Sequence, residues 1–80
     1  MTTLATNDLV SLSHTRKIVD TGQLRRVRQR AGLTQAELAE AVGVTSGAVC
    51  RWELGDIRPT SARARRLADV LNVLEASNAH

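Results

Sequence analysis

Arginine dominates the basic side chains of this 80-residue chain: ten of its eleven basic residues are Arg, and the formal net charge is +3. A guanidinium is a planar fork of N–H donors that bonds in pairs to phosphate oxygens or to guanine O6 and N7. One Trp is the only aromatic residue, whereas proteins that stack RNA or single-stranded bases usually carry several. The composition therefore favours duplex nucleic acid over single strands, although modest positive charge also serves solubility.

The sequence shows no pattern typical of catalysis or of metal binding. It has no nucleophile–base pair, carboxylate dyad or phosphate loop, and its two His residues have no partners at metal-ligand spacing. A single Cys excludes a disulfide within the chain. The chain shows neither a signal-peptide pattern nor an apolar run of about 18 residues. We therefore expect a cytoplasmic protein without enzymatic activity, cofactor, metal or membrane.

Two short helices joined by a tight turn are predicted within residues 34–54. Thr34 followed three residues later by Glu37 forms a capping box that starts the first helix. Gly43 can adopt the left-handed conformation that ends this helix, Thr45 caps the second helix, and Gly55 ends it. Two capped helices separated by so few residues are typical of a helix-turn-helix.

The remaining elements are also helical. Residues 1–20 have a poor apolar pattern and are expected to form a weak helix or a partly ordered arm. A helix is predicted over residues 21–31, capped by Thr21, and another from Thr60 or Ser61 to a stop at Asn72. We therefore predict an all-α protein, a compact bundle of four to five helices. Its parts are an arm (1–20), a helix-turn-helix domain (21–74) and a C-terminal tail (75–80).

Apolar residues at helical spacing are expected to form a core that lies wholly beyond residue 20. The core predicted in this way comprises Leu24, Val27, Leu33, Leu38, Ala39, Val42, Val44, Val49, Trp52, Leu67 and Leu71. Deletion of residues 1–15 should then leave the bundle folded.

The second helix of the motif has two distinct faces. Val49, Trp52 and Glu53 share one face by their i, i+3, i+4 spacing and should point inward. The outward side chains are then Thr45, Ser46, Gly47, Cys50 and Arg51. Arg51 is the best candidate for a bidentate guanine contact, whereas the hydroxyl of Ser46 is too short for a bidentate bond to adenine.

The most specific features of residues 24–73 are Thr34-Gln35, Leu38-Ala39, Gly43, Val49, Trp52-Glu53, Gly55 and Pro59. With these features in register, the segment resembles the Cro/CI-type (Xre) helix-turn-helix family of phage and bacterial repressors. The resemblance implies a lambda-repressor-like DNA-binding domain whose second motif helix, residues 45–54, lies in the major groove. In the family, the outward residues of this helix touch base edges. The implied partner is double-stranded DNA, a short operator with half-sites, bound by a monomer or by a weak or DNA-induced homodimer.

Other residues are candidates for contacts with the DNA phosphates or for an ion pair that supports the motif. Gln35, at the start of the first motif helix, resembles the phosphate contact of the family. Arg58, in the link after the second motif helix, is a further phosphate candidate. The arm contributes Arg16 and Lys17 as phosphate candidates. Arg28 and Glu53 resemble a structural ion pair of the family.

Alternative functions share the same predicted bundle. The chain could be a transcriptional repressor, a phage accessory protein, an antitoxin, or an adaptor that binds another protein through Trp52 or through residues 9–12. Binding through phosphates weakens steeply as salt rises, whereas binding through an apolar interface does not. The salt dependence of binding therefore separates the first class from the last.

Overall fold

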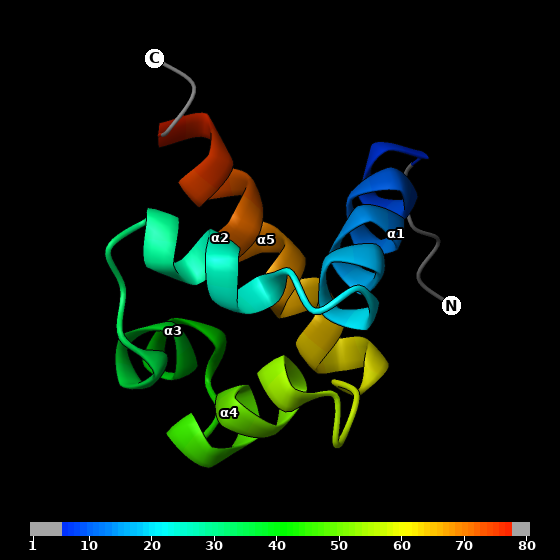
Figure 1. Ribbon diagram of the computed structural model, residues 1–80. Coiled ribbons are helices and arrows are strands. Elements are labelled where there is room, and N and C mark those ends of the chain that lie inside the picture. The colour runs from blue at the N-terminus through cyan, green and yellow to red at the C-terminus, as the bar shows by residue number, and fades with distance from the viewer. Residues whose placement is uncertain (1–5, 78–80) are drawn as a thin grey trace.

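The computed structural model describes residues 6–77, and within this range it contains five helices and no strand. The helices are α1 (Thr6–Asp20), α2 (Leu24–Arg30), α3 (Gln35–Val42), α4 (Ser46–Leu54) and α5 (Ser61–Ser77). α5 runs through the middle of the bundle, with α1 on one side of it and the α3–α4 pair at one end (Figure 1). The predicted all-α fold is confirmed.

The helix-turn-helix forms as its capping residues predict. Thr34 Oγ1 accepts a hydrogen bond from the Glu37 N–H at 3.0 Å, and Glu37 Oε1 accepts one from the Thr34 N–H at 2.9 Å. Hydrogen bonding of the Glu37 carboxyl by the backbone N–H and the side chain of Thr34 lowers its pKa. Gly43 ends α3 with a φ of +85°, and Thr45 Oγ1 accepts from the N–H of Ala48 at the start of α4. The turn is therefore specified locally, by residues within about ten positions of one another.

The core is centred on Trp52, whose exposed fraction is 2%. Leu24, Leu38, Leu67 and Leu71 are also almost fully buried, as predicted. Three predicted core residues, Val27, Leu33 and Val44, are only partly buried. The largest apolar group of the chain thus lies where α4 meets the rest of the bundle, and it fixes α4 from its inner side.

The expectation that the core lies wholly beyond residue 20 is wrong. α1 is a full helix that packs against α5, and it buries Leu12, Ile18 and Val19 to exposed fractions of 6% each. Thr15 lies between them on the same face and is 2% exposed. A polar residue at a core position breaks the apolar period, which explains why the sequence pattern appeared poor. Residues 1–5 of the expected arm lie outside the described residues.

Two predicted helix ends are also wrong. α2 begins at Leu24, and Thr21 does not cap it: its hydroxyl donates to the carbonyl of Lys17 at the end of α1. α5 continues past Asn72, whose Nδ2 donates to Ser11 Oγ on α1 at 3.1 Å. Asn72 therefore links two helices instead of stopping one, and the expected boundary at residue 74 falls inside α5. Residues 78–80 of the expected tail lie outside the described residues.

Candidate nucleic-acid interface

The two faces of α4 differ in burial as the sequence predicts. Val49 and Trp52 are buried in the core, and the side chain of Glu53 is only 3% exposed. On the opposite side, Ser46, Gly47 and Arg51 are exposed, and Cys50 is half-buried. α4 therefore presents an uncovered polar face while its inner face is held by the bundle.

An ion pair joins α2 to the end of α4. Arg28 Nε donates to Glu53 Oε2 at 2.6 Å, and Arg28 Nη2 donates to Glu53 Oε1 at 3.1 Å, so the pair is bidentate. A third donor of the same guanidinium, Nη1, bonds to the carbonyl of Leu33 at 2.8 Å. The two side chains are 10% and 3% exposed. The ion pair predicted between Arg28 and Glu53 is thus present and shielded from water.

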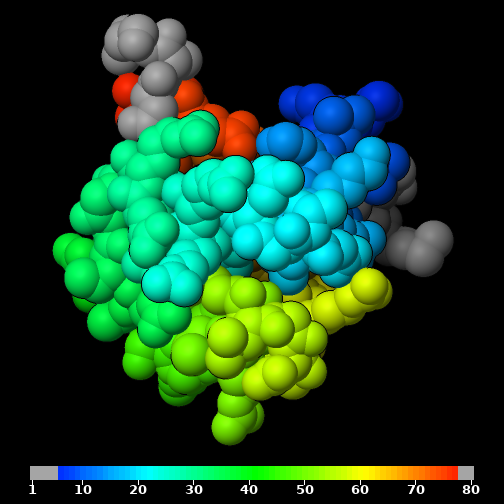
Figure 2. Space-filling model, in the orientation of Figure 1, coloured from blue at the N-terminus to red at the C-terminus, as the bar shows by residue number. Residues whose placement is uncertain are grey.

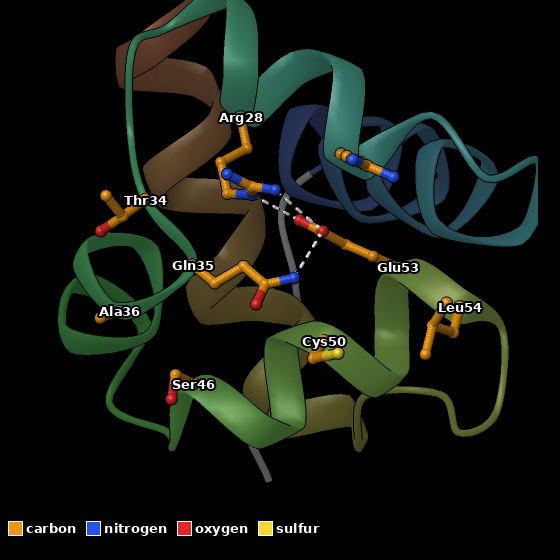
Figure 3. A pocket seen from close by; sticks show the side chains of 9 residues that line it. Arg28, Thr34, Gln35, Ala36, Ser46, Cys50, Glu53 and Leu54 are labelled. Carbon is orange, nitrogen blue, oxygen red and sulfur yellow. Dashed lines mark hydrogen bonds and ion pairs between the residues drawn. The ribbon is translucent and has the colours of Figure 1, made fainter.

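A third side chain completes this network from α3. Gln35 Nε2 donates to Glu53 Oε1 at 3.0 Å. Figure 3 shows the amide nitrogen directed at Glu53 and the amide oxygen directed away from it, towards α4. One N–H of the amide is therefore already engaged, and a phosphate contact by this side chain must use the other one.

The electrostatics of the network keep Glu53 ionised. Burial raises the pKa of this carboxyl, but the hydrogen bonds from Arg28 and Gln35 and the charges of Arg28 and Arg25 outweigh burial and hold the pKa below its ordinary value. The hydrogen bond to Glu53 in turn raises the pKa of Arg28, against the opposing effect of burial. Both partners therefore carry full charge at neutral pH.

The network forms one wall of a groove between α2, α3 and α4 (Figure 3). Its volume is about 700 Å³, and it is lined by Arg25, Arg28, Thr34, Gln35, Ala36, Ser46, Cys50, Glu53 and Leu54. The groove thus brings together Gln35, a predicted phosphate contact, with Ser46 and Cys50, two predicted base contacts. An anionic ligand lying along this groove would meet α4 and the start of α3 at once.

Arg25 is a further basic residue of this groove that was not predicted as a site residue from the sequence. Arg25 is exposed, lines the groove, and lies three residues before Arg28 on the same face of α2. Unlike Arg28, it makes no ion pair within the described residues. The spacing of the two Arg residues was a usable signal: with Arg28 assigned to an inward pair, Arg25 is the cation on that face that remains available to a ligand.

Gly47 has no internal reason to be glycine. Its conformation is helical, and a Cβ atom built at this residue would meet only the Thr45 hydroxyl, at an ordinary contact distance of 3.8 Å. Glycine inside a helix costs about 1 kcal/mol relative to alanine. Because Gly47 has no side chain, the backbone of α4 is directly accessible on the exposed face at this point.

The remaining phosphate candidates fall in two places. Arg58 is 79% exposed and pairs with Asp20 at the end of α1, and Arg16 lines the same small depression. Lys17 lies apart from them, in a depression on α1 that also contains Leu9 and Val10. The structure therefore brings Arg16 together with Arg58 but does not bring Lys17 to them.

Two kinds of feature are absent from the part of the chain that the structure describes. Among residues 6–77, no three His, Cys, Asp or Glu side chains gather closely enough to hold a metal ion. Nor does any helix in this range combine the length and the apolar character needed to cross a membrane.

Comparisons with known proteins agree with this geometry. The sequence model of the helix-turn-helix family matches residues 24–76, which include α2 to α4 and nearly all of α5. Over 48 residues the chain is 44% identical to an uncharacterized HTH-type transcriptional regulator of Methanothermobacter thermautotrophicus, an alignment that covers 60% of this chain and 70% of the relative. No solved structure matches the chain.

Proposed function

Because the chain belongs to the Xre/Cro-CI-type helix-turn-helix family, we propose that it is a sequence-specific, repressor-like regulator of transcription that places α4 in the major groove of double-stranded DNA. The observation that carries this proposal is the arrangement of α4. Its inner face is buried through Val49 and Trp52, while its outer face is uncovered beside the start of α3. A helix held in this way can enter the groove without any rearrangement of the bundle.

The base contacts are proposed for the outer face of α4. Arg51 is exposed and its side chain makes no hydrogen bond or ion pair within the described residues, so its guanidinium can turn to a guanine edge. Thr45, Ser46 and Cys50 contribute shorter contacts. Gly47 lets the backbone of α4 approach the bases closely.

The phosphate contacts are proposed for both sides of α4. Gln35 and the free N–H groups at the start of α3 meet the backbone on one side, with Arg25 beside them. Arg58 and Arg16 meet the backbone beyond the end of α4. Lys17 is left out of this interface because it lies in a different depression.

The chain is proposed to bind a short operator as a weak or DNA-induced homodimer in the cytoplasm, associated with the nucleoid. A two-fold symmetric pair of α4 helices requires two half-sites about one turn of DNA apart. Footprinting on a selected site tests this part of the proposal. Two protected half-sites about 10 base pairs apart support the dimer, whereas one protected segment supports a monomer.

The test of the function compares Arg51→Ala with Gln35→Ala on a duplex selected from random sequences. Arg51→Ala should weaken binding to the selected site by about 1–3 kcal/mol and relax the base preference at one guanine. Gln35→Ala should weaken all duplexes alike and leave both the base preference and the salt slope unchanged, because no cation is lost. Each variant is titrated against the selected duplex and its single-base variants at two salt concentrations.

Two results would redirect the assignment. Equal weakening of every duplex by Arg51→Ala, with a salt slope lower by about one unit, would make Arg51 a phosphate contact. Absence of duplex binding by the unmodified chain would favour the adaptor function instead. Leu9 and Val10, 51% and 63% exposed on α1, are two of the exposed large apolar side chains that such a partner could cover.

A further inference from the structure

α1 lies outside the segment that matches the helix-turn-helix family, yet its last turn meets the proposed DNA-binding surface. The family match begins at residue 24, whereas α1 ends at Asp20. Figure 2 shows the link between α4 and α5, in yellow-green to yellow, beside the light-blue C-terminal end of α1. This contact joins the helix that is extra to the family segment with the link that carries Arg58.

The contact is made of two guanidinium groups and one carboxylate. Arg58 Nε lies 3.1 Å from Asp20 Oδ1, and the two side chains are 79% and 41% exposed. Arg16 Nη2 donates to Ser61 Oγ at 3.5 Å, just beyond the link. All three charged residues line a depression of about 60 Å³, which has room for about two water molecules. A depression of this size and charge suits the oxygens of one phosphate, and it is too small for a base.

Asp20 is poorly placed to stabilise the fold. It is the last residue of α1, and a negative charge near a helix C-terminus is opposed by the helix dipole. Its ion pair with Arg58 is open to water, and such pairs contribute little to stability. The pairing does, however, occupy the cation that would otherwise attract a phosphate.

Building on the proposed function, we propose that Asp20, Arg58 and Arg16 form a phosphate site in which the Asp20 carboxylate competes with the DNA backbone. In the free protein Asp20 holds the Arg58 guanidinium. On binding, a backbone phosphate takes its place, and Arg16 supplies a second donor to the same phosphate. α1 thus both extends the contact with DNA and limits its strength.

The test is the variant Asp20→Asn, which removes the competing charge and keeps the shape of the side chain. Binding of a phosphate to Arg58 has to break its exposed ion pair with Asp20, and the loss of such a pair weakens binding about threefold. Asp20→Asn should therefore bind the selected duplex about threefold more tightly at low salt, with a salt slope steeper by up to one unit. Asp8→Asn is the matched control, because it makes the same change on α1, in a depression lined by Arg65 and Asp69 away from Arg58.

The second half of the test repeats Asp20→Asn in the Arg58→Ala background. The gain in affinity should disappear there, since Asp20 acts through Arg58. An equal gain from Asp8→Asn, or a gain that persists without Arg58, would show that Asp20 only contributes to the general charge, and the proposal would be wrong. Thermal melts of each variant should stay near that of the unmodified chain. Failure of the unmodified chain to bind any duplex would overturn the proposed function and this proposal together.

Discussion

Glu53→Ala should destabilise the protein strongly, because it leaves the buried Arg28 guanidinium without its anionic partner. The change removes both hydrogen bonds that Arg28 makes to Glu53 and the one that Gln35 makes, while Arg28 keeps only its bond to the Leu33 carbonyl. Arg28 is 10% exposed in the intact network, so water can replace the lost partner only in part. Removing one member of a buried ion pair costs about 3–5 kcal/mol.

The open groove beside Arg28 places the expected loss near the lower limit, about 3 kcal/mol, because the guanidinium can recover some solvent there. A domain of 80 residues has a total stability of about 4–12 kcal/mol. For this size, 3 kcal/mol corresponds to a fall in Tm of about 12–24 °C. Glu53→Ala should therefore remove between about a quarter and three quarters of the total stability.

The assay is a set of thermal and urea melts of Glu53→Ala, Arg28→Ala and the double variant. The double variant should lose less stability than the sum of the two single variants, by on the order of 2 kcal/mol, since the second change removes a charge that the first left unpaired. Glu40→Ala, an exposed glutamate on α3, is the control and should change little. Small and strictly additive losses would refute the argument, because they would mean that the two side chains do not interact in solution.

Two further predictions follow from the same structure. Leu12→Ala should lower the free energy of unfolding by about 2–3 kcal/mol in thermal melts, because Leu12 is only 6% exposed. Val10→Ala on the same helix should have little effect, because Val10 is 63% exposed, and equal effects of the two changes would mean that α1 is dispensable for folding. The stability that Glu53 supplies should be present above pH 4.5 and be lost as the pH falls through the lowered pKa of Glu53, since the unfolded chain binds this proton first. In urea melts between pH 3 and 7, the free energy of unfolding should therefore fall less with acidification in Glu53→Gln than in the unmodified chain.

The helix-turn-helix could be predicted from the sequence because its determinants are close together along the chain. Thr34, Glu37, Gly43 and Thr45 each act on the backbone within a few residues, and each acts in the structure as its type implies. The inward orientation of Trp52 followed from periodicity alone. Local hydrogen bonding and helical spacing were sufficient for this part of the fold.

The role of α1 could not be predicted in this way because it depends on contacts with α5, more than forty residues later in the chain. Ser11 bonds to Asn72, and His14 Nε2 lies 3.2 Å from Glu75 Oε1. No local signal marks such pairs. The buried hydroxyl of Thr15 also hid the apolar stripe on α1 that faces the core.

Gln35 shows why the candidate site cannot be divided into structural and DNA-binding residues. The family resemblance suggested a phosphate contact, but the structure also makes Gln35 a donor to the Glu53 carboxylate that fixes the end of α4. Loss of duplex binding in Gln35→Ala could therefore arise from a lost phosphate contact or from a shifted α4. A shifted α4 would disturb the outer face that carries Arg51, and base preference would change with it. Uniform weakening with base preference intact is consequently evidence for the phosphate contact itself.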